Sequence, residues 1–259
     1  MGRRASAIRC VLLLAVPCAL VALSACSGAI APAETTVANQ EQAANPQPLS
    51  YEDLGQQEQA AVTAWRAWAE AGIAGEIRTG EEDWDRHMDD LREQARTADS
   101  EFKREIYTRV VSDQFSRHTL PGSLSDMREK LEALGQSELT DDQMARVQHV
   151  ITREAFAVDL ANTTWLKREF AANGNDWWTI SQVGEQPAYY LWLLAQHADR
   201  DPDFQKQALA SMETLLADGE VDRTNFAYLF DRVATPAGEP QRYGTQIECR
   251  DGRLQPMPL

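Results

Sequence analysis

Apolar residues recur at helical spacing through the first part of the chain. Between residues 50 and 137 they form four stripes with steps of three and four residues, which place side chains on one face of an α-helix. Residues 72–80 and the pair Pro121-Gly122 supply the breaks between stripes. The pattern predicts a helical region built on Val62, Trp65, Ala69 and Ile73; on Trp84, Met88, Leu91 and Ala95; on Phe102, Ile106 and Val110; and on Leu124, Met127, Leu131 and Leu134.

A long helix is predicted to follow. Thr140 and Gln143 have the spacing of a capping box, so the helix should begin there and run to about Ala172. Asn162 falls in the centre of its apolar stripe. Because a buried amide without a partner costs about 1 to 3 kcal/mol, we expect Asn162 to be hydrogen-bonded to a neighbouring element or to a ligand.

The next predicted helix carries a histidine on its apolar face. It begins near Pro187, and His197 lies near its carboxyl end on the same face as Tyr190 and Leu194. The helix dipole favours the protonated imidazole there and burial opposes it, so His197 is a candidate acid or base. The alternative is a histidine that only packs.

The remaining pattern completes a mainly α fold. Helices are predicted after the Asp201 cap and over about residues 222–234, where Asp231 and Arg232 lie off the apolar stripe and are expected to be solvated or in local ion pairs. Residues 243–249 and 253–257 flank Asp251-Gly252, a good hairpin turn. We therefore expect a multi-helix orthogonal bundle with a small C-terminal β-hairpin, divided into an N-terminal helical region (50–137) and a C-terminal helical domain (138–259).

The amino terminus reads as an export signal. Three arginines precede an apolar run over residues 11–23, which is too short to span a bilayer comfortably. The run ends in Leu23-Ser24-Ala25-Cys26, which resembles the lipobox of bacterial lipoproteins. The resemblance implies a signal peptide over residues 1–25, a lipidated Cys26, and attachment to the outside of the bacterial membrane. Ser27 after the cysteine implies the outer membrane, facing the periplasm, if the host is double-membraned.

Residues 26–49 are expected to form a flexible tether, because they are rich in Ala, Pro, Gln, Asn and Thr and have no apolar periodicity. Cys10 and Cys18 leave with the signal and Cys26 takes the lipid, so only Cys249 remains. The sequence thus predicts no disulfide, no cysteine-based zinc site and no cofactor.

The negative net charge argues against two classes of binding partner. With 25 Lys and Arg against 40 Asp and Glu, the net charge is −15. Nucleic acid and anionic lipid both require clustered positive charge, so neither is an expected partner of the folded part. The sequence does not indicate the oligomeric state.

Several separated motifs resemble one bacterial family of unknown function, domain family 6624. They are Asp159-x-x-Asn162-Thr163-x-Trp165, Gln196-His197-Ala198-Asp199, Asp231-Arg232 and Gln241-x-Tyr243-Gly244-Thr245-Gln246, within about residues 143–249. One departure is Asp176-Trp177-Trp178-Thr179, where the family tends to show Gly-Trp-Pro. The resemblance implies no reaction, but it favours the polar residues of these motifs as site residues.

The first functional hypothesis is a polar cleft for ligand binding or hydrolysis. His197 would be the general acid or base and Asp231 would orient it. The groups expected to bind the ligand are Asn162, Gln196, Arg232, Tyr243 and Gln246, with Arg232 and Gln246 holding an anionic or amide-bearing substrate. The sequence contains no serine elbow, HExxH helix, Walker loop or dinucleotide fingerprint to assign a named class.

Two other hypotheses stay open. The chain is either a non-catalytic, acidic envelope lipoprotein that docks a basic protein, with association speeded by electrostatic steering, or a protein whose motifs only cross-link helices to the hairpin.

Overall fold

The architecture was obtained from a computed structural model, which describes residues 49–136, 138–250 and 253–258. The predicted signal peptide, Cys26, nearly all of the tether and the Asp251-Gly252 turn lie outside these residues. Among these residues, no helix combines the length and the hydrophobicity that a membrane span requires.

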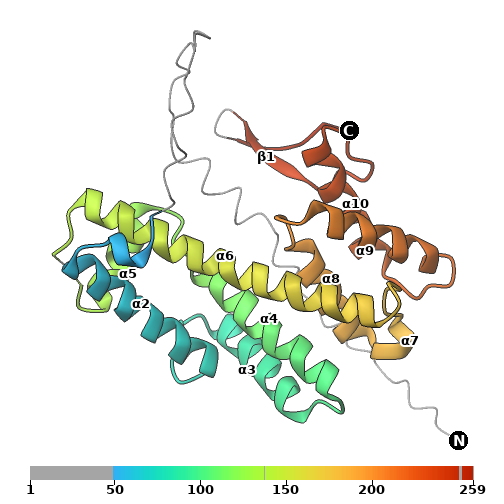
Figure 1. The fold of residues 1–259 in the computed structure, drawn as a ribbon, viewed down its shortest axis with the longest axis horizontal. Helices are drawn as coiled ribbons and strands as arrows, with labels where there is room; N and C mark the ends of the chain where they lie inside the picture. The colour runs from blue at the N-terminus through green and yellow to red at the C-terminus, as the bar shows by residue number, and fades with distance from the viewer. Residues whose placement is uncertain (1–48, 137, 251–252, 259) are drawn as a thin grey trace, which may run out of the picture.

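The fold is mainly α, as predicted (Figure 1). In chain order the helical elements are η2 (Tyr51–Asp53), α2 (Gln56–Ala74), α3 (Glu82–Thr97), α4 (Glu101–Thr119), α5 (Leu124–Ala133), α6 (Asp141–Ala172), α7 (Ile180–Val183), α8 (Glu185–Gln196), α9 (Pro202–Leu215), α10 (Arg223–Ala234) and η3 (Thr235–Ala237).

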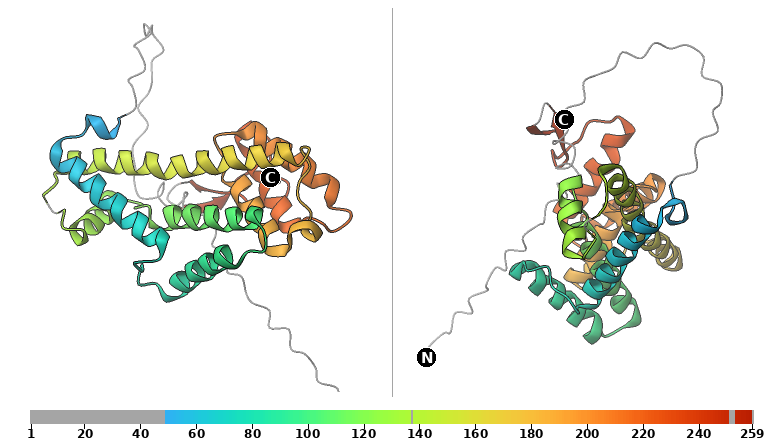
Figure 2. Two further views of the ribbon diagram at one scale, coloured as in Figure 1. Left: turned by 60° about the horizontal axis from the view of Figure 1, so that its bottom comes forward. Right: turned by 90° about the vertical axis from the view of Figure 1, so that its left-hand side faces the viewer.

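The longest element is α6, with 32 residues and hence a length of about 48 Å. It begins at the predicted capping box: the Thr140 hydroxyl accepts from the Gln143 N–H at 3.4 Å, and the Gln143 side chain accepts from the Thr140 N–H at 3.0 Å. In the left view of Figure 2, α2 slants beneath α6 from its amino-terminal end, α4 runs alongside α6, and the C-terminal helices lie at the carboxyl-terminal end of α6.

Two apolar clusters fill the interior along α6. The smaller joins α2, α5 and the first half of α6, whereas the larger joins α3, α4, the second half of α6 and helices α8 to α10. Helices from both predicted regions, 50–137 and 138–259, contribute to each cluster. They therefore share their cores.

The predicted C-terminal hairpin is confirmed, although its strands are shorter. β1 (Ile247–Arg250) pairs antiparallel with β2 (Arg253–Pro256), with Ile247 opposite Pro256. The chain before Ile247 is not extended strand, because its backbone N–H groups bond to Asp231 instead of a neighbouring strand.

Candidate functional site

His197 lies at a corner between two helices. It is the C-cap residue of α8, its N–H donates to the Leu193 carbonyl at 3.1 Å, and its side chain is 4% exposed. Tyr190 and Leu194, which share its face of α8, are buried as predicted. Four residues further, Asp201 caps α9 by accepting from the Phe204 N–H at 3.0 Å.

The carboxylate that contacts His197 belongs to Asp113 on α4. Nδ1 of His197 lies 2.9 Å and 3.0 Å from the two Asp113 carboxylate oxygens, and the Asp113 side chain is fully buried. Burial raises the pKa of Asp113, but the charge and hydrogen bond of His197, assisted by Arg117, outweigh it and the net pKa is lowered. Asp113 is therefore ionised at neutral pH.

Arg117 joins Asp113 to a second acid, Asp159 on α6. Nε of Arg117 lies 3.4 Å from Asp113 and Nη2 lies 2.7 Å from Asp159. Burial raises the pKa of Asp159, and the nearby charge of Asp113 adds to this, while Arg117 opposes it; the net pKa is raised. The two acids thus have pKa values shifted in opposite directions, an arrangement that separates acid and base roles in enzymes.

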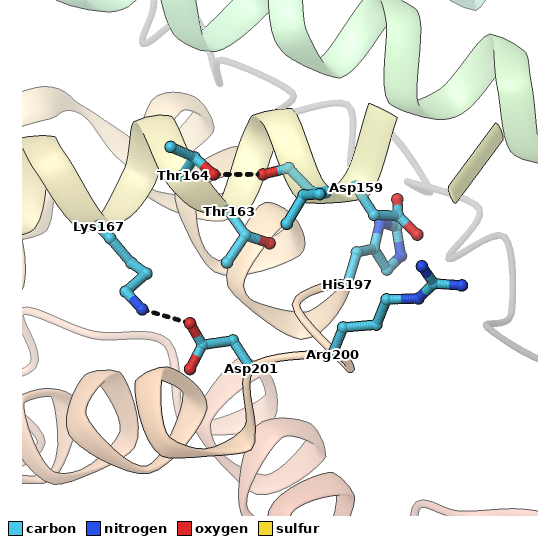
Figure 3. A pocket seen from close by; sticks show the side chains of 8 residues that line it. Asp159, Thr163, Thr164, Lys167, His197, Arg200 and Asp201 are labelled. Atoms are coloured by element: carbon cyan, nitrogen blue, oxygen red, sulfur yellow. Dashed lines mark hydrogen bonds and ion pairs between the residues drawn. The ribbon is translucent and has the colours of Figure 1, made fainter. Parts of the chain in front are cut away.

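His197 and Asp159 line a polar hollow of about 300 Å³ (Figure 3). Its floor and walls come from the second half of α6 and from the corner between α8 and α9. Lys167 and Asp201 form an ion pair across it. The full lining consists of Asp159, Leu160, Thr163, Thr164, Lys167, His197, Arg200 and Asp201.

Asn162 and Gln196 are buried and do not line this cleft. Oδ1 of Asn162 accepts from Nη1 of Arg109 on α4 at 3.4 Å, a neighbouring element as one of the two predictions has it, whereas its Nδ2 has no hydrogen-bond partner among the described residues. The Gln196 side-chain amide is buried and has no hydrogen-bond partner among the described residues. Ligand binding by either residue stays a prediction.

Asp231 does not orient His197, and its predicted solvation is wrong. Its side chain is buried, and its carboxylate accepts hydrogen bonds from the N–H groups of Arg242 at 2.7 Å, Tyr243 at 3.1 Å and Thr245 at 3.0 Å, and from the Thr245 hydroxyl. Burial raises the pKa of Asp231, but these backbone hydrogen bonds outweigh it and lower the net pKa. Asp231 organises the loop before β1.

The other predicted ligand-binding groups also have structural contacts. Arg232 pairs with Asp199, with Nε 2.7 Å from the carboxylate. Nε2 of Gln246 lies 3.4 Å from the Tyr228 carbonyl, and the Tyr243 ring packs edge-on against Phe230. None of Asp231, Arg232, Tyr243 and Gln246 is among the cleft-lining residues. The cleft that His197 lines is therefore built from other residues than these four.

Asp113 was missed by the sequence reasoning. One signal pointed to it: Ile106, Val110 and Asp113 follow helical steps of four and three, so the carboxylate occupies a position where α4 is buried. A charged residue at such a position requires a buried partner. The partner itself is 84 residues away and follows only from the packing of α4 against α8.

Fold and site together define a mainly α protein with a buried histidine–aspartate pair, of which the histidine lines a cleft. The family model described as "Family of unknown function (DUF6624)" matches residues 122–259. Since this is more than half of the chain, the chain belongs to that family, and the resemblance inferred from the motifs is confirmed. No curated protein and no solved structure matches the chain.

The family match begins after α4 ends. His197, Asp159 and the rest of the cleft lining lie within it, whereas Asp113 and Arg117 lie before it. The site is completed by a helix outside the matched segment. Among the described residues no group of three or more His, Cys, Asp or Glu side chains is placed to hold a metal ion.

Proposed function

We propose that the chain is a bacterial lipoprotein, tethered through Cys26 on the outside of the membrane, whose folded body hydrolyses a small polar substrate in the cleft at His197. The arginine-led apolar run and the lipobox-like residues 23–26 support the tether. In a double-membraned host the protein would be on the outer membrane, facing the periplasm.

The single observation that carries the hydrolytic role is the buried Asp113–His197 pair at the edge of the cleft. An ionised Asp113 accepts a hydrogen bond from Nδ1–H, which fixes the ring and leaves the basic lone pair on Nε2 in the neutral imidazole. His197 then acts as general base toward a water molecule. Arg117 keeps Asp113 in place and neutralises part of its charge.

Asp159 is the complementary acid. Because its pKa is raised, a larger fraction of it carries a proton than of an ordinary aspartate. For an ester or amide, hydroxide formed at His197 adds to the carbonyl carbon, Asp159 donates its proton to the departing alcohol or amine, and the proton on His197 restores Asp159 through water. The sum is addition of water across one bond.

A histidine substitution tests this role. In His197→Gln, hydrolysis of 4-nitrophenyl esters and amino-acid 4-nitroanilides should fall by roughly 100-fold or more, since acid–base catalysis contributes about 10² to 10⁴. The matched control is His149→Gln on the exposed side of α6, which should keep full activity. Equal turnover by wild type and His197→Gln would contradict the proposal.

The tether has its own test. Cys26→Ser should abolish incorporation of labelled palmitate and move the protein from the membrane fraction to the soluble fraction. Cys18→Ser, inside the proposed signal peptide, should do neither. Retention of the label in Cys26→Ser would place the lipid elsewhere.

Docking of a basic protein remains the alternative, favoured by the net charge of −15. It predicts salt-sensitive capture of a basic protein from periplasmic extract, unchanged in His197→Gln. Under the hydrolytic proposal the same variant loses turnover.

A further inference from the structure

Arg200 is a cation of the cleft that has no ion-pair partner among the described residues. It follows His197 in the corner between α8 and α9 and lines the cleft with it. Its guanidinium lies over the Phe156 ring of α6, 4.8 Å from the centroid, and among the described residues no carboxylate forms an ion pair with it. In Figure 3 the Arg200 side chain extends past His197 on the side where Asp159 lies.

The neighbouring cations are already neutralised. Lys167 pairs with Asp201 across the cleft, and Arg117 behind His197 pairs with both Asp113 and Asp159. An anion that enters the cleft would therefore meet its strongest unbalanced positive charge at Arg200. Its planar guanidinium, supported by the Phe156 ring, has the fork geometry that binds carboxylate and phosphate groups through two parallel hydrogen bonds.

An apolar side chain accompanies this cation. Leu160 lines the cleft and is 58% exposed, so its side chain is accessible to a ligand in the cleft. It lies one helical turn after Phe156, so the two share a face of α6. The cleft thus offers a cation beside an apolar contact, which suits a ligand with an anionic group next to an apolar one.

We infer that the cleft takes a small ligand whose carboxylate or phosphate group binds Arg200 and whose adjoining apolar group contacts Leu160. The inference rests on the proposed function only in using the same cleft. It names the substrate class that the hydrolytic proposal leaves open. Anion binding at Arg200 can be tested whether or not the protein hydrolyses a substrate.

Binding of three non-hydrolysable probes tests the inference. Phenylacetate carries a carboxylate, benzylphosphonate carries a phosphonate, and phenylacetone has a similar shape but no charge. Titration calorimetry on the full chain in a nonionic detergent, with a detergent-only blank, measures each dissociation constant. We expect at least one anion to bind roughly tenfold more tightly than phenylacetone, and the tighter anion identifies carboxylate or phosphate as the group.

Two arginine variants locate the contact. Arg200→Gln should weaken the preferred anion roughly tenfold and leave phenylacetone unchanged. Arg168→Gln, an exposed arginine of α6 paired with Glu169 and absent from the cleft lining, should bind like wild type. Unchanged thermal unfolding of Arg200→Gln shows that the variant is folded.

Any of three results would overturn the inference. Neither anion binds at concentrations up to about 10 mM, or phenylacetone binds as tightly as the anions. In the third, Arg200→Gln and Arg168→Gln lose the same affinity for the preferred anion. Because none of the probes is cleaved, these results are separate from a failure of the hydrolytic proposal, which is read from turnover in His197→Gln.

Discussion

The Asp113 carboxylate is the most constrained charge in the site. It is fully buried and contacts His197, Arg117 and the side-chain amide of Gln114, whose Nε2 lies 2.8 Å from it. Removing one member of a buried, hydrogen-bonded charge pair typically costs about 3 to 5 kcal/mol, because the other charge stays buried without compensation. Asp113 is therefore both a structural and a positioning residue for His197.

The pKa of Asp113 predicts how stability depends on pH. Its folded pKa lies below the ordinary value of 3.8, so the ionised group stabilises the protein above that pH, and this contribution is lost as pH falls through the folded pKa. In Asp113→Asn, the free energy of unfolding should drop by roughly 3 kcal/mol at pH 7 and should fall less steeply than in wild type below pH 4.

Urea unfolding at several pH values measures this effect. Asp142→Asn, an exposed acid in the first turn of α6, should keep the wild-type pH dependence. An acid limb of the same slope in Asp113→Asn and wild type would show that Asp113 is not linked to folding in this way.

Among the elements, α2 and α4 are in close contact at Gly72. A Cβ atom built there would lie 2.0 Å from Cζ of Phe115, far inside van der Waals contact. Phe115 is itself 2% exposed, so its ring has little room to move. The glycine is needed for space, not for an unusual backbone angle.

Gly72→Ala should therefore destabilise the fold by about 1 to 3 kcal/mol through overpacking, although alanine is the better helix former. Thermal or urea unfolding measures the change. Gly122→Ala, where the added Cβ would make an ordinary 3.5 Å contact with Asp126, is the matched control and should be nearly neutral. Partial recovery in the double variant Gly72→Ala, Phe115→Leu would identify the clash as the cause.

The elements themselves were largely predictable from the sequence. Apolar spacing, the Thr140 capping box and the Asp201-Pro202 start signal reflect local physics, and the helices predicted to begin near Thr140, Pro187 and Asp201 begin close to those positions. The partners of polar residues were not predictable in this way. Asp231 was expected in solvent because it lies off the apolar stripe of α10, yet three backbone N–H groups of a later loop enclose it.

The candidate site was likewise predictable only in part. His197 was identified from its position on an apolar face and in a motif, whereas its carboxylate partner was assigned to Asp231 instead of Asp113. The choice depends on which helix packs beside the end of α8, and no local pattern contains that information. Asp159 belongs to a recognised motif and Arg200 follows one, but both gained a role only from the shape of the cleft.

At the scale of the whole molecule, the family segment does not contain its own complete core. The larger apolar cluster includes Trp84, Met88, Ile106 and Phe115 from α3 and α4, which precede residue 122. Removing them would expose the faces of α6 and α8 that they cover. The histidine–aspartate pair would also lose its acid.

A fragment limited to residues 122–259 should therefore lack cooperative unfolding. We expect residues 49–259 to show a sharp thermal transition by near-ultraviolet circular dichroism and the fragment to show a broad one or none, with increased binding of a hydrophobic dye. A sharp transition in the fragment would mean that the C-terminal part folds independently. Adding residues 82–119 as a separate peptide tests whether α3 and α4 restore it.

The connection between α8 and α9 that contains His197 has a fixed length. His197 is fixed to the last turn of α8 through Leu193, and Asp201 is fixed to the first turn of α9 through Phe204. An insertion or deletion between them would shift Asp201 and its partner Lys167 relative to the imidazole. Length variants that keep the cleft are thus confined to connections elsewhere, and an engineered tag or label is best inserted outside residues 197–201.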